Sequence, residues 1–188
     1  MVKNPKGVNQ LTDSLFFDTD CLSAFLWVDR ENLLTDLYPG QVVIPEQVYG
    51  ELSLPGVFRF SIRIDTLFSQ KRVAIVNIET GTEAFDLYYT LSAFPSKGHS
   101  IIGKGEAACI ALAKTTGGII ASNNLRDVSS YVKEFDLRHV TTGDILVEAC
   151  DRQYITEDEG NAIWASMLFK RRKLGAETFS EYLVSKRR

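Results

Sequence analysis

Short apolar runs alternate with helical patterns along most of the chain. Four of these runs have the length of buried strands, at residues 15–17, 41–44, 72–76 and 119–121, and residues 138–140 are expected to form a last short strand. Stretches with helical periodicity separate them. Repeated strand-then-helix units predict a parallel sheet covered by helices on both faces. We therefore expect a three-layer α/β/α fold with a central parallel sheet and further helices at the C-terminus.

Turn and capping residues indicate where the predicted helices begin and end. We expect helices at residues 22–28, 46–52, 62–69, 83–91, 105–114, 142–150, 156–173 and 177–183, and one that is capped at 124 or 127 and runs to 135. Pro45 suits the first turn of the second helix, and Thr82 and Thr142 are N-cap candidates. The run TEDE fits a capping box, with Glu159 three positions after Thr156.

The chain of 188 residues is long enough for one well-buried core, and we expect a single domain. Residues 1–13 should form an N-terminal tail, 14–152 the core and 153–188 a C-terminal helical extension. Hydrophobic residues make up 45% and charged residues 24%, which is typical of globular proteins. Composition alone therefore leaves the function open.

The N-terminal segment and the cysteines predict a cytoplasmic protein. Residues 1–14 contain no apolar stretch of the kind that a secretory signal needs. No apolar run approaches the ~20 residues that span a bilayer, so we expect no membrane association. The cysteines Cys21, Cys109 and Cys150 lie far apart in apolar stretches. This spacing favours buried free thiols over a disulfide frame or a zinc site.

Two short basic clusters interrupt a slightly acidic chain. The formal net charge is −3, so overall charge does not advertise a nucleic-acid partner. The clusters are KRRK at residues 170–173 and KRR at residues 186–188. Taken alone, they favour a solvated helix face and a solubilising tail over a phosphate-binding patch.

Four carboxylates stand where local structure gives little reason for them. Asp18 ends the first predicted strand, and Asp127 follows the fourth. Glu51 lies near the end of a predicted helix, where its charge opposes the helix dipole. Glu106 opens an Ala-rich helix among residues that otherwise belong to a core. Asp18 and Ser122 are expected at the carboxyl ends of strands, where parallel α/β sheets bind ligands.

If the four carboxylates converge, their mutual repulsion favours a cation in the same site. Hard oxygen ligands suit Mg²⁺ or Mn²⁺ better than zinc, and such ions polarise phosphoryl oxygens and activate water. The two histidines, His99 and His139, have no metal-ligand spacing, which argues against a histidine-based hydrolase. Each acid alone is also explained as a helix cap, and Glu106 gains from its helix dipole without a metal. The order and spacing of all four favour the metal site.

The order of the acidic motifs resembles the PIN domain family of metal-dependent nucleases, whose best-populated bacterial and archaeal branch is the VapC-like toxins. The matching motifs are FFDTDCLSAF, IPEQVYGEL, GKGEAACIALA and ASNNLRDV, in that order along the chain. They carry the family's four acidic roles onto Asp18, Glu51, Glu106 and Asp127. The resemblance covers residues 15–150. The C-terminal segment is similar to the extension of some larger PIN-like proteins.

The resemblance implies an enzyme that cleaves phosphodiesters, most often in RNA, with Mg²⁺ or Mn²⁺ as its cofactor. It implies a metal held by Asp18, Glu106 and Asp127, and ligand waters positioned by Glu51. Water would attack phosphorus in line and the 3′ oxygen would leave. An antitoxin protein as partner and a homodimer are further expectations from the family.

Four other residues near the acids have implied supporting roles. Ser122 and Asn124 would orient the first and the fourth acid, because metal ligands usually need such hydrogen bonds. Lys104 and Arg126 flank the third and the fourth acid and would contact substrate phosphates. Surface solubility explains these two cations equally well.

Two features depart from the family pattern. Asp20 stands where relatives usually carry Ser or Asn. We expect it to cap the helix that starts near Leu22, with a hydrogen bond to a metal-bound water as the alternative. The segment between the second and the third acid is also long for a compact toxin. We interpret its aromatic residues Phe85, Tyr88 and Tyr89 as a core-facing stripe in preference to a base-stacking platform.

Two other functions stay open at this point. The run FFDTD also suggests haloacid-dehalogenase-type phosphatases, which begin with D-x-D-x-[TV] and use the first Asp as a nucleophile. The fifth position here is Leu22, however, and no later Asp-Asp pair follows a strand. The other alternative is a catalytically silent PIN fold that binds nucleic acid or protein. The intact acidic set argues against this module, and the acidic net charge argues for it.

Overall fold

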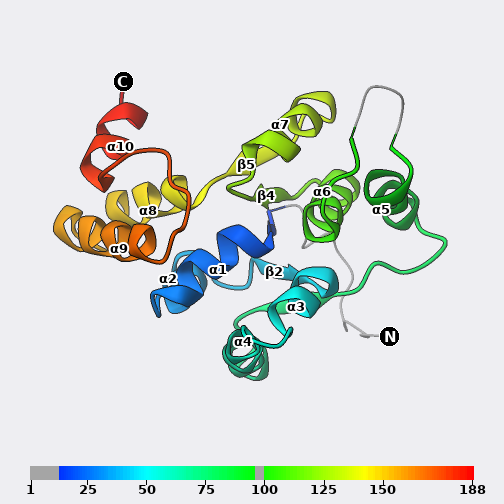
Figure 1. Ribbon diagram of the computed structural model, residues 1–188, viewed down its shortest axis with the longest axis horizontal. Coiled ribbons are helices and arrows are strands. Elements are labelled where there is room, and N and C mark those ends of the chain that lie inside the picture. Colours follow the sequence, from blue (N-terminus) through cyan, green and yellow to red (C-terminus); the bar gives the residue numbers. More distant parts are fainter. Residues whose placement is uncertain (1–12, 96–99) are drawn as a thin grey trace.

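Figure 1 shows the computed structural model of the protein, which describes residues 13–95 and 100–188 except the side chain of Asp127. Among these residues, parallel strands form one five-stranded sheet in the order β3-β2-β1-β4-β5. The strands are β1 Leu15–Phe17, β2 Val42–Pro45, β3 Ala74–Val76, β4 Ile119–Ala121 and β5 Arg138–Val140. The predicted α/β fold with a parallel sheet is confirmed. His99 and most of the predicted N-terminal tail lie outside the described residues.

The strand order reverses at the centre of the sheet. The chain runs from β1 outward to β2 and β3, and then crosses to the other side of β1 to form β4 and β5. In the register of β1 with β4, Phe17 lies opposite Ala121. The N–H of Asp18 continues this pairing and donates to the Ala121 carbonyl at 3.0 Å. The carboxyl ends of β1 and β4 therefore flank the crevice at which such folds bind ligands.

Helices flank the sheet (Figure 1), and one of them, α6, is buried over most of its length. The helices of the described residues are α1 Thr19–Trp27, α2 Glu31–Leu37, α3 Glu46–Leu52, α4 Arg59–Ser69, α5 Glu83–Ala93, α6 Lys104–Thr116, α7 Leu125–Glu134, α8 Thr142–Asp151, α9 Glu157–Phe169 and α10 Phe179–Lys186. Every residue from 107 to 113 is buried, because α6 packs between β1 and α5. This buried helix carries Glu106 in its first turn.

The C-terminal helices are docked by aromatic rings that lie against glycines. A methyl group on Gly143 of α8 would lie 2.5 Å from the Tyr182 ring, and one on Gly160 of α9 would lie 2.4 Å from the Phe179 ring. The Tyr182 hydroxyl also donates to Asp144 at 3.0 Å. Both glycines therefore let α10 approach α8 and α9 at a distance that any side chain would prevent.

The predicted N-caps are confirmed at two positions and wrong at a third. Thr82 accepts from the backbone at the start of α5, and Thr156 forms the predicted capping box of α9. Helix α8, in contrast, begins at Thr142, and its N-cap is Thr141. The Thr141 side chain and Asp144 form a reciprocal capping box. Helix α8 therefore begins one residue after Thr141, because the Thr141 hydroxyl accepts the capping hydrogen bond from the Asp144 N–H.

One helix was not predicted, and the end of α9 differs most from its predicted position. Helix α2 was not predicted, because seven residues with two buried leucines, Leu34 and Leu37, are too few to show a period. Helix α9 ends at Phe169, earlier than the predicted end at residue 173. Arg171 has a positive φ of 59°, a conformation that no helix interior allows.

The aromatic stripe of α5 faces the core only in part. Phe85 and Tyr88 are half-buried, whereas Tyr89 is exposed. The ring of Tyr89 stacks on that of Phe85, with 6.3 Å between the ring centres. The prediction of a core-facing stripe is therefore wrong for Tyr89, which covers a neighbouring ring at the surface.

In residues 13–95 and 100–188, no helix combines the length and the apolar character needed to cross a membrane. All three cysteines are free thiols. Cys21 and Cys109 are buried, as predicted, and Cys150 is half-buried. Burial raises the pKa of the Cys21 and Cys109 thiols, which keeps both protonated at neutral pH.

Candidate active site

Asp18 lies at the carboxyl end of the central strand and caps helix α1. Its Oδ1 accepts a hydrogen bond of 2.6 Å from the backbone N–H of Cys21. The residue is 1% exposed. Its other oxygen, Oδ2, is also buried and has no hydrogen-bond partner among the described residues. A buried carboxylate oxygen without a donor is costly, so this atom requires a proton or a cation.

Burial raises the pKa of Asp18 to about 7, from an ordinary value of 3.8. The loss of hydration is the largest cause, and the negative charges of Glu106 and Asp20 raise the pKa further. Hydrogen bonds from the Ser122 side chain and from the Cys21 backbone lower it. The charge of Glu106 therefore acts on Asp18 directly, as expected for two carboxylates in one site.

Glu106 reaches this site from the first turn of α6, where the positive end of the helix dipole favours a carboxylate. The side-chain amide of Asn124 donates to Glu106 Oε1 at 3.2 Å. The backbone N–H of Asn124 donates to the Ser122 hydroxyl at 3.1 Å, and the Ser122 side chain lies near enough to Asp18 to lower its pKa. The loop after β4 therefore connects the two carboxylates through two of its residues.

Glu51 approaches from α3 and is held by Thr19, the first residue of α1. The Thr19 hydroxyl donates a hydrogen bond to Glu51 Oε2. Gly105 of α6 lies against the same pair: a methyl group there would lie 3.2 Å from Thr19 Oγ1 and 3.4 Å from Glu51 Oε2. The structure thus brings Glu51 to the first turns of α1 and α6, the same two turns that carry Asp18 and Glu106.

The remaining predicted residues lie at the helix starts that follow the site. Asp127 belongs to α7, directly after β4, and its side chain is outside the described part of the structure. Lys104 and Arg126 are exposed in the first turns of α6 and α7. Among the side chains that are described, no three acids, histidines or cysteines form a complete metal site. The ligand role of Asp127 and the phosphate contacts of both cations stay predictions.

Asp20 does not cap α1, because Asp18 fills that position. The prediction of a cap at Asp20 is therefore wrong. Its carboxylate instead pairs with Arg172 of the C-terminal extension, with 3.3 Å between Oδ1 and Nη1. The same nitrogen lies 3.5 Å from the Ser23 hydroxyl. An arginine from the far end of the chain thus reaches the first turn of α1, two residues from Asp18.

Two further polar residues support the loop after β4 from behind. The Asn123 amide donates to Thr142 Oγ1 at 2.8 Å and accepts from the Thr142 N–H at 2.9 Å. His139 Nε2 lies 2.9 Å from the Ser122 carbonyl. Burial lowers the pKa of His139, so its neutral ring donates this hydrogen bond at neutral pH. These contacts fix the loop that orients Asp18 and Glu106.

Sequence reasoning missed four polar residues of this site: Thr19, Asn123, His139 and Arg172. Thr19 and Asn123 stood inside quoted motifs, but no local rule indicated their partners. His139 lacked a metal-ligand spacing, and its role as a backbone donor leaves no signal in the sequence. Arg172 lay in the basic cluster, where only the path of the chain shows which cation faces the acids.

The described carboxylates fit a hard divalent cation. Asp18 Oδ2 lacks a donor among the described residues, and Glu106 contributes a second carboxylate near it. Oxygen donors of this kind are preferred by Mg²⁺ and Mn²⁺. A cation at this position would satisfy Oδ2 and offset the repulsion that raises the pKa of Asp18.

A family model described as PIN domain matches residues 14–186. This range contains all five strands and the C-terminal helices, so the chain belongs to the PIN domain family. PIN domains are generally nucleases, and PIN nucleases typically use divalent metals. The match shows the family and not its VapC-like branch. A comparison with curated proteins found no significant match.

Proposed function

We propose that this protein is a divalent-metal-dependent phosphodiesterase that cleaves RNA. The observation that carries the proposal is the buried Oδ2 of Asp18, which lacks a donor among the described residues and lies at the switch point of a PIN-domain sheet. Asp18 and Glu106 would hold Mg²⁺ or Mn²⁺, with Asp127 as the third ligand. Such an ion, when bound, polarises a phosphoryl oxygen and lowers the pKa of water.

The surrounding residues hold the two described carboxylates in place before a cation binds. The Cys21 N–H holds Oδ1 of Asp18, and the Asn124 amide holds Oε1 of Glu106. Neither carboxylate therefore needs to reorganise when it receives its ligand, and both keep an oxygen for it. This is the support that an active site of fixed geometry requires.

We assign Glu51 the positioning of water and the exposed cations the positioning of substrate. Thr19 holds one oxygen of Glu51, which leaves the other to accept a hydrogen bond from water. Lys104 and Arg126, in the first turns of neighbouring helices, would contact phosphates on either side of the scissile bond. The attacking water adds to phosphorus in line, and the 3′ oxygen leaves with a proton. The products are a 5′-phosphate and a 3′-hydroxyl.

Finer assignments rest on the likeness to VapC-like toxins. A toxin role would require an antitoxin protein as partner, and a homodimer would be the expected oligomer. Both follow from the family resemblance described above, and both are open to direct measurement by co-purification and by light scattering. The catalytic proposal does not depend on either of them.

A cleavage assay tests the proposal. An end-labelled single-stranded RNA is incubated with the purified chain in Mn²⁺, in Mg²⁺ and in EDTA. We expect cleavage with either metal and none in EDTA, and Asp18→Asn should lower the rate at least a hundredfold. Asp86→Asn, at an exposed aspartate in the first turn of α5, is the matched control and should cleave at the wild-type rate. Equal rates for Asp18→Asn and the wild type contradict the proposal.

The same assay separates the enzyme from the catalytically silent alternative. A silent PIN fold would bind the RNA and release it intact under every metal condition. A phosphatase of the haloacid-dehalogenase type would leave the RNA intact as well, but would hydrolyse small phosphomonoesters and trap phosphate on Asp18. Each class therefore gives a different pattern of products.

A further inference from the structure

The turn after α9 carries cations along the edge of the candidate active site. We call residues 170–173 the basic turn; it lies between α9 and the last helix, α10, and passes close to α1 (Figure 1). Its Arg172 pairs with Asp20 in the first turn of α1. The backbone N–H of Arg172 donates to Met167 at 3.0 Å, and its Nε donates to the Lys170 carbonyl at 3.2 Å. The Arg172 guanidinium is therefore held beside Asp20, which is two residues after Asp18 in the sequence.

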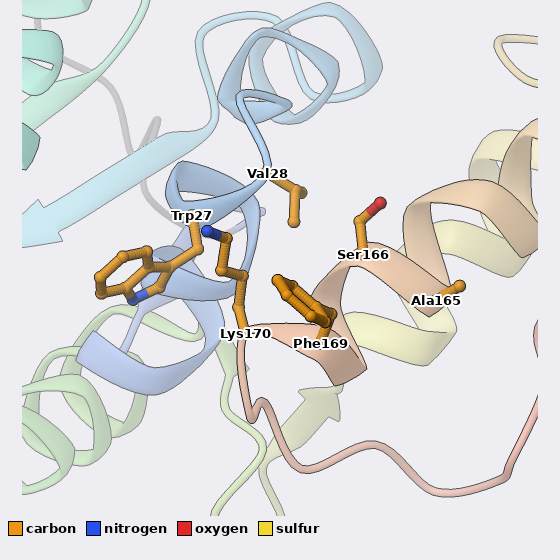
Figure 2. A pocket seen from close by; sticks show the side chains of 6 residues that line it. All are labelled: Trp27, Val28, Ala165, Ser166, Phe169 and Lys170. Carbon is orange, nitrogen blue, oxygen red and sulfur yellow. The ribbon is translucent and has the colours of Figure 1, made fainter.

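One end of the basic turn meets an aromatic pocket at the other end of α1. This Trp27–Phe169 pocket has a volume of about 460 Å³ and lies between the last residues of α1 and α9 (Figure 2). Lys170 Nζ lies 5.7 Å from the centre of the Trp27 ring and 5.8 Å from that of Phe169. Arg59 places a second cation 4.5 Å from the Trp27 ring. The pocket is thus lined by two aromatic rings and the Lys170 ammonium group, and Arg59 lies against the Trp27 ring without lining the pocket.

Phe169 is the unusual member of this pocket. It is 84% exposed, which for a phenylalanine leaves a large apolar ring in water without a structural gain. The residue ends α9 and adjoins the basic turn. An exposed ring beside cations is the arrangement by which proteins bind unpaired bases next to a phosphate backbone.

The other end of the basic turn reaches the loop behind the catalytic acids. Lys173 lines a second cavity of about 230 Å³, together with Asn123 and Thr141. Asn123 lies two residues after Ala121, whose carbonyl accepts a hydrogen bond from the Asp18 N–H. The cations at 170, 172 and 173 therefore run from the aromatic pocket, past Asp20, to the end of β4. The candidate site itself is acidic, so a polyanion needs neighbouring cations of this kind to approach it.

We propose that the basic turn and the Trp27–Phe169 pocket bind an unpaired strand of nucleic acid, with Arg172 contacting a phosphate and Phe169 stacking on a base. This inference rests on the proposed function and names the surface that presents the substrate. Helix α1 separates the pocket from Asp18; its nine residues span about 14 Å. That length corresponds to about four nucleotides at the 3.4 Å axial rise per nucleotide of a stacked strand.

Direct binding measurements test this surface without relying on catalysis. A fluorescein-labelled ten-nucleotide RNA without secondary structure is titrated with the full chain in EDTA, and anisotropy gives Kd at several salt concentrations. We expect Arg172→Ala to raise Kd about tenfold and to lower the salt slope by about one, because one phosphate contact is lost. Phe169→Ala should raise Kd about tenfold and leave the salt slope unchanged, because stacking carries no charge.

Matched control variants show whether the loss of binding is specific to Arg172 and Phe169 or follows from removing any arginine or any exposed aromatic ring. Arg187→Ala removes another arginine of the extension that is paired with an aspartate, Asp151. Phe94→Ala removes another exposed ring, at the C-cap of α5. Both should change Kd less than twofold. Arg172→Lys should restore the salt slope. Losses as large in the two control variants as in Arg172→Ala and Phe169→Ala would overturn the proposal.

A purely structural role for Arg172 gives a different result. If the ion pair with Asp20 only tethered the extension, Arg172→Ala would lower Tm and leave Kd unchanged, and the proposal would fail. Single-stranded DNA should bind as the RNA does, because phosphates and bases are the recognised groups. A duplex should bind more weakly and be insensitive to Phe169→Ala. Tighter binding of the duplex contradicts the stacking role.

Failure here can be told apart from failure of the proposed function. A wild type that binds the RNA but cleaves none in Mn²⁺ contradicts the nuclease and leaves the binding surface supported. A wild type that cleaves, and whose Kd is unchanged by Arg172→Ala and Phe169→Ala, contradicts the binding surface and leaves the nuclease supported. A wild type that does not bind single strands overturns the surface outright.

Discussion

The side-chain amide of Asn124 donates a hydrogen bond to the Glu106 carboxylate, with 3.2 Å between the nitrogen and Oε1. The contact joins the loop after β4 to the first turn of α6. Asn124 is neutral, so it orients the acid without competing with a cation for its charge. Glu106 is therefore both near Asp18 and fixed in direction, as a metal ligand needs to be.

Removal of this amide should weaken metal binding. Asn124→Ala leaves Glu106 without its donor and should lower Mn²⁺ affinity about tenfold to a hundredfold, the usual cost of losing a hydrogen bond to a metal ligand. Titration calorimetry with Mn²⁺ gives the affinity. Asn161→Ala, which removes an amide bonded to Ser180 in the C-terminal helices, is the control. Wild-type affinity in Asn124→Ala would show that the amide has no such role.

Thr19 should act on the reaction through Glu51. Thr19→Val keeps the shape of the side chain but removes the hydroxyl that donates to Glu51. We expect kcat for RNA cleavage to fall about tenfold, with little change in Tm. Thr19→Ser returns the hydroxyl and should recover most of the rate. If the cleavage rates of the wild type, Thr19→Val and Thr19→Ser follow their Tm values and not the presence of the hydroxyl, the assignment is contradicted.

The raised pKa of Asp18 predicts how the metal-free protein responds to pH. An aspartate with a folded pKa of about 7 and an ordinary value of 3.8 binds its proton more tightly in the folded state. Its contribution to stability is therefore complete below pH 3.8 and is lost as pH rises through 7. Between pH 5 and pH 8 in EDTA, the wild type should lose about 3 kcal/mol relative to Asp18→Asn.

Urea unfolding of both proteins across that pH range provides the measurement. The difference between the two free energies of unfolding isolates the titration of Asp18, because other groups titrate in both proteins. Saturating Mn²⁺ should remove the loss at pH 8 in the wild type only. A pH-independent difference would mean that Asp18 is ionised in the fold without a cation.

The docking of α10 should depend on Gly143. A methyl group there would lie 2.5 Å from the Tyr182 ring, so Gly143→Ala should lower the free energy of unfolding by about 1–3 kcal/mol. Gly50→Ala is the matched control, because a methyl group on that helical glycine meets nothing within 4 Å. It should stabilise the protein by about 0.5–1 kcal/mol through helix propensity. Thermal and urea unfolding measure both, and equal effects would contradict the packing argument.

Much of the fold was predictable because its signals are local. Four of the five strands are short, largely apolar runs, whereas β5 is Arg-His-Val. Helix α3 has the predicted bounds, residues 46–52, although Pro45 is its N-cap and the last residue of β2 and does not belong to its first turn. Thr82 and Thr156 marked two further starts through their own hydrogen bonds. Helix α2 carried no such signal. Thr141, and not the predicted Thr142, is the N-cap of α8, because the Thr141 hydroxyl accepts from the N–H of Asp144.

The candidate site was predictable as a set of acids, but not as a set of contacts. Motif order pointed to Asp18, Glu51 and Glu106. In the structure Asp18 follows the central strand of the sheet, Glu106 lies near enough to raise the pKa of Asp18, and Glu51 is held by Thr19 at the start of α1. Which aspartate caps α1 depends on the local backbone, and the sequence argument chose Asp20. Its pairing with Arg172 spans 152 residues. No local pattern encodes such a contact, because it depends on how the C-terminal helices dock.

The measurement that tests the account most directly is calorimetric titration of the purified chain with Mn²⁺. The account predicts saturable binding by the wild type and by Asp86→Asn, and loss of that binding in Asp18→Asn, whose amide cannot supply the charge of the buried Oδ2. Binding of equal affinity and stoichiometry in Asp18→Asn would contradict the claim that Asp18 is the centre of a metal site.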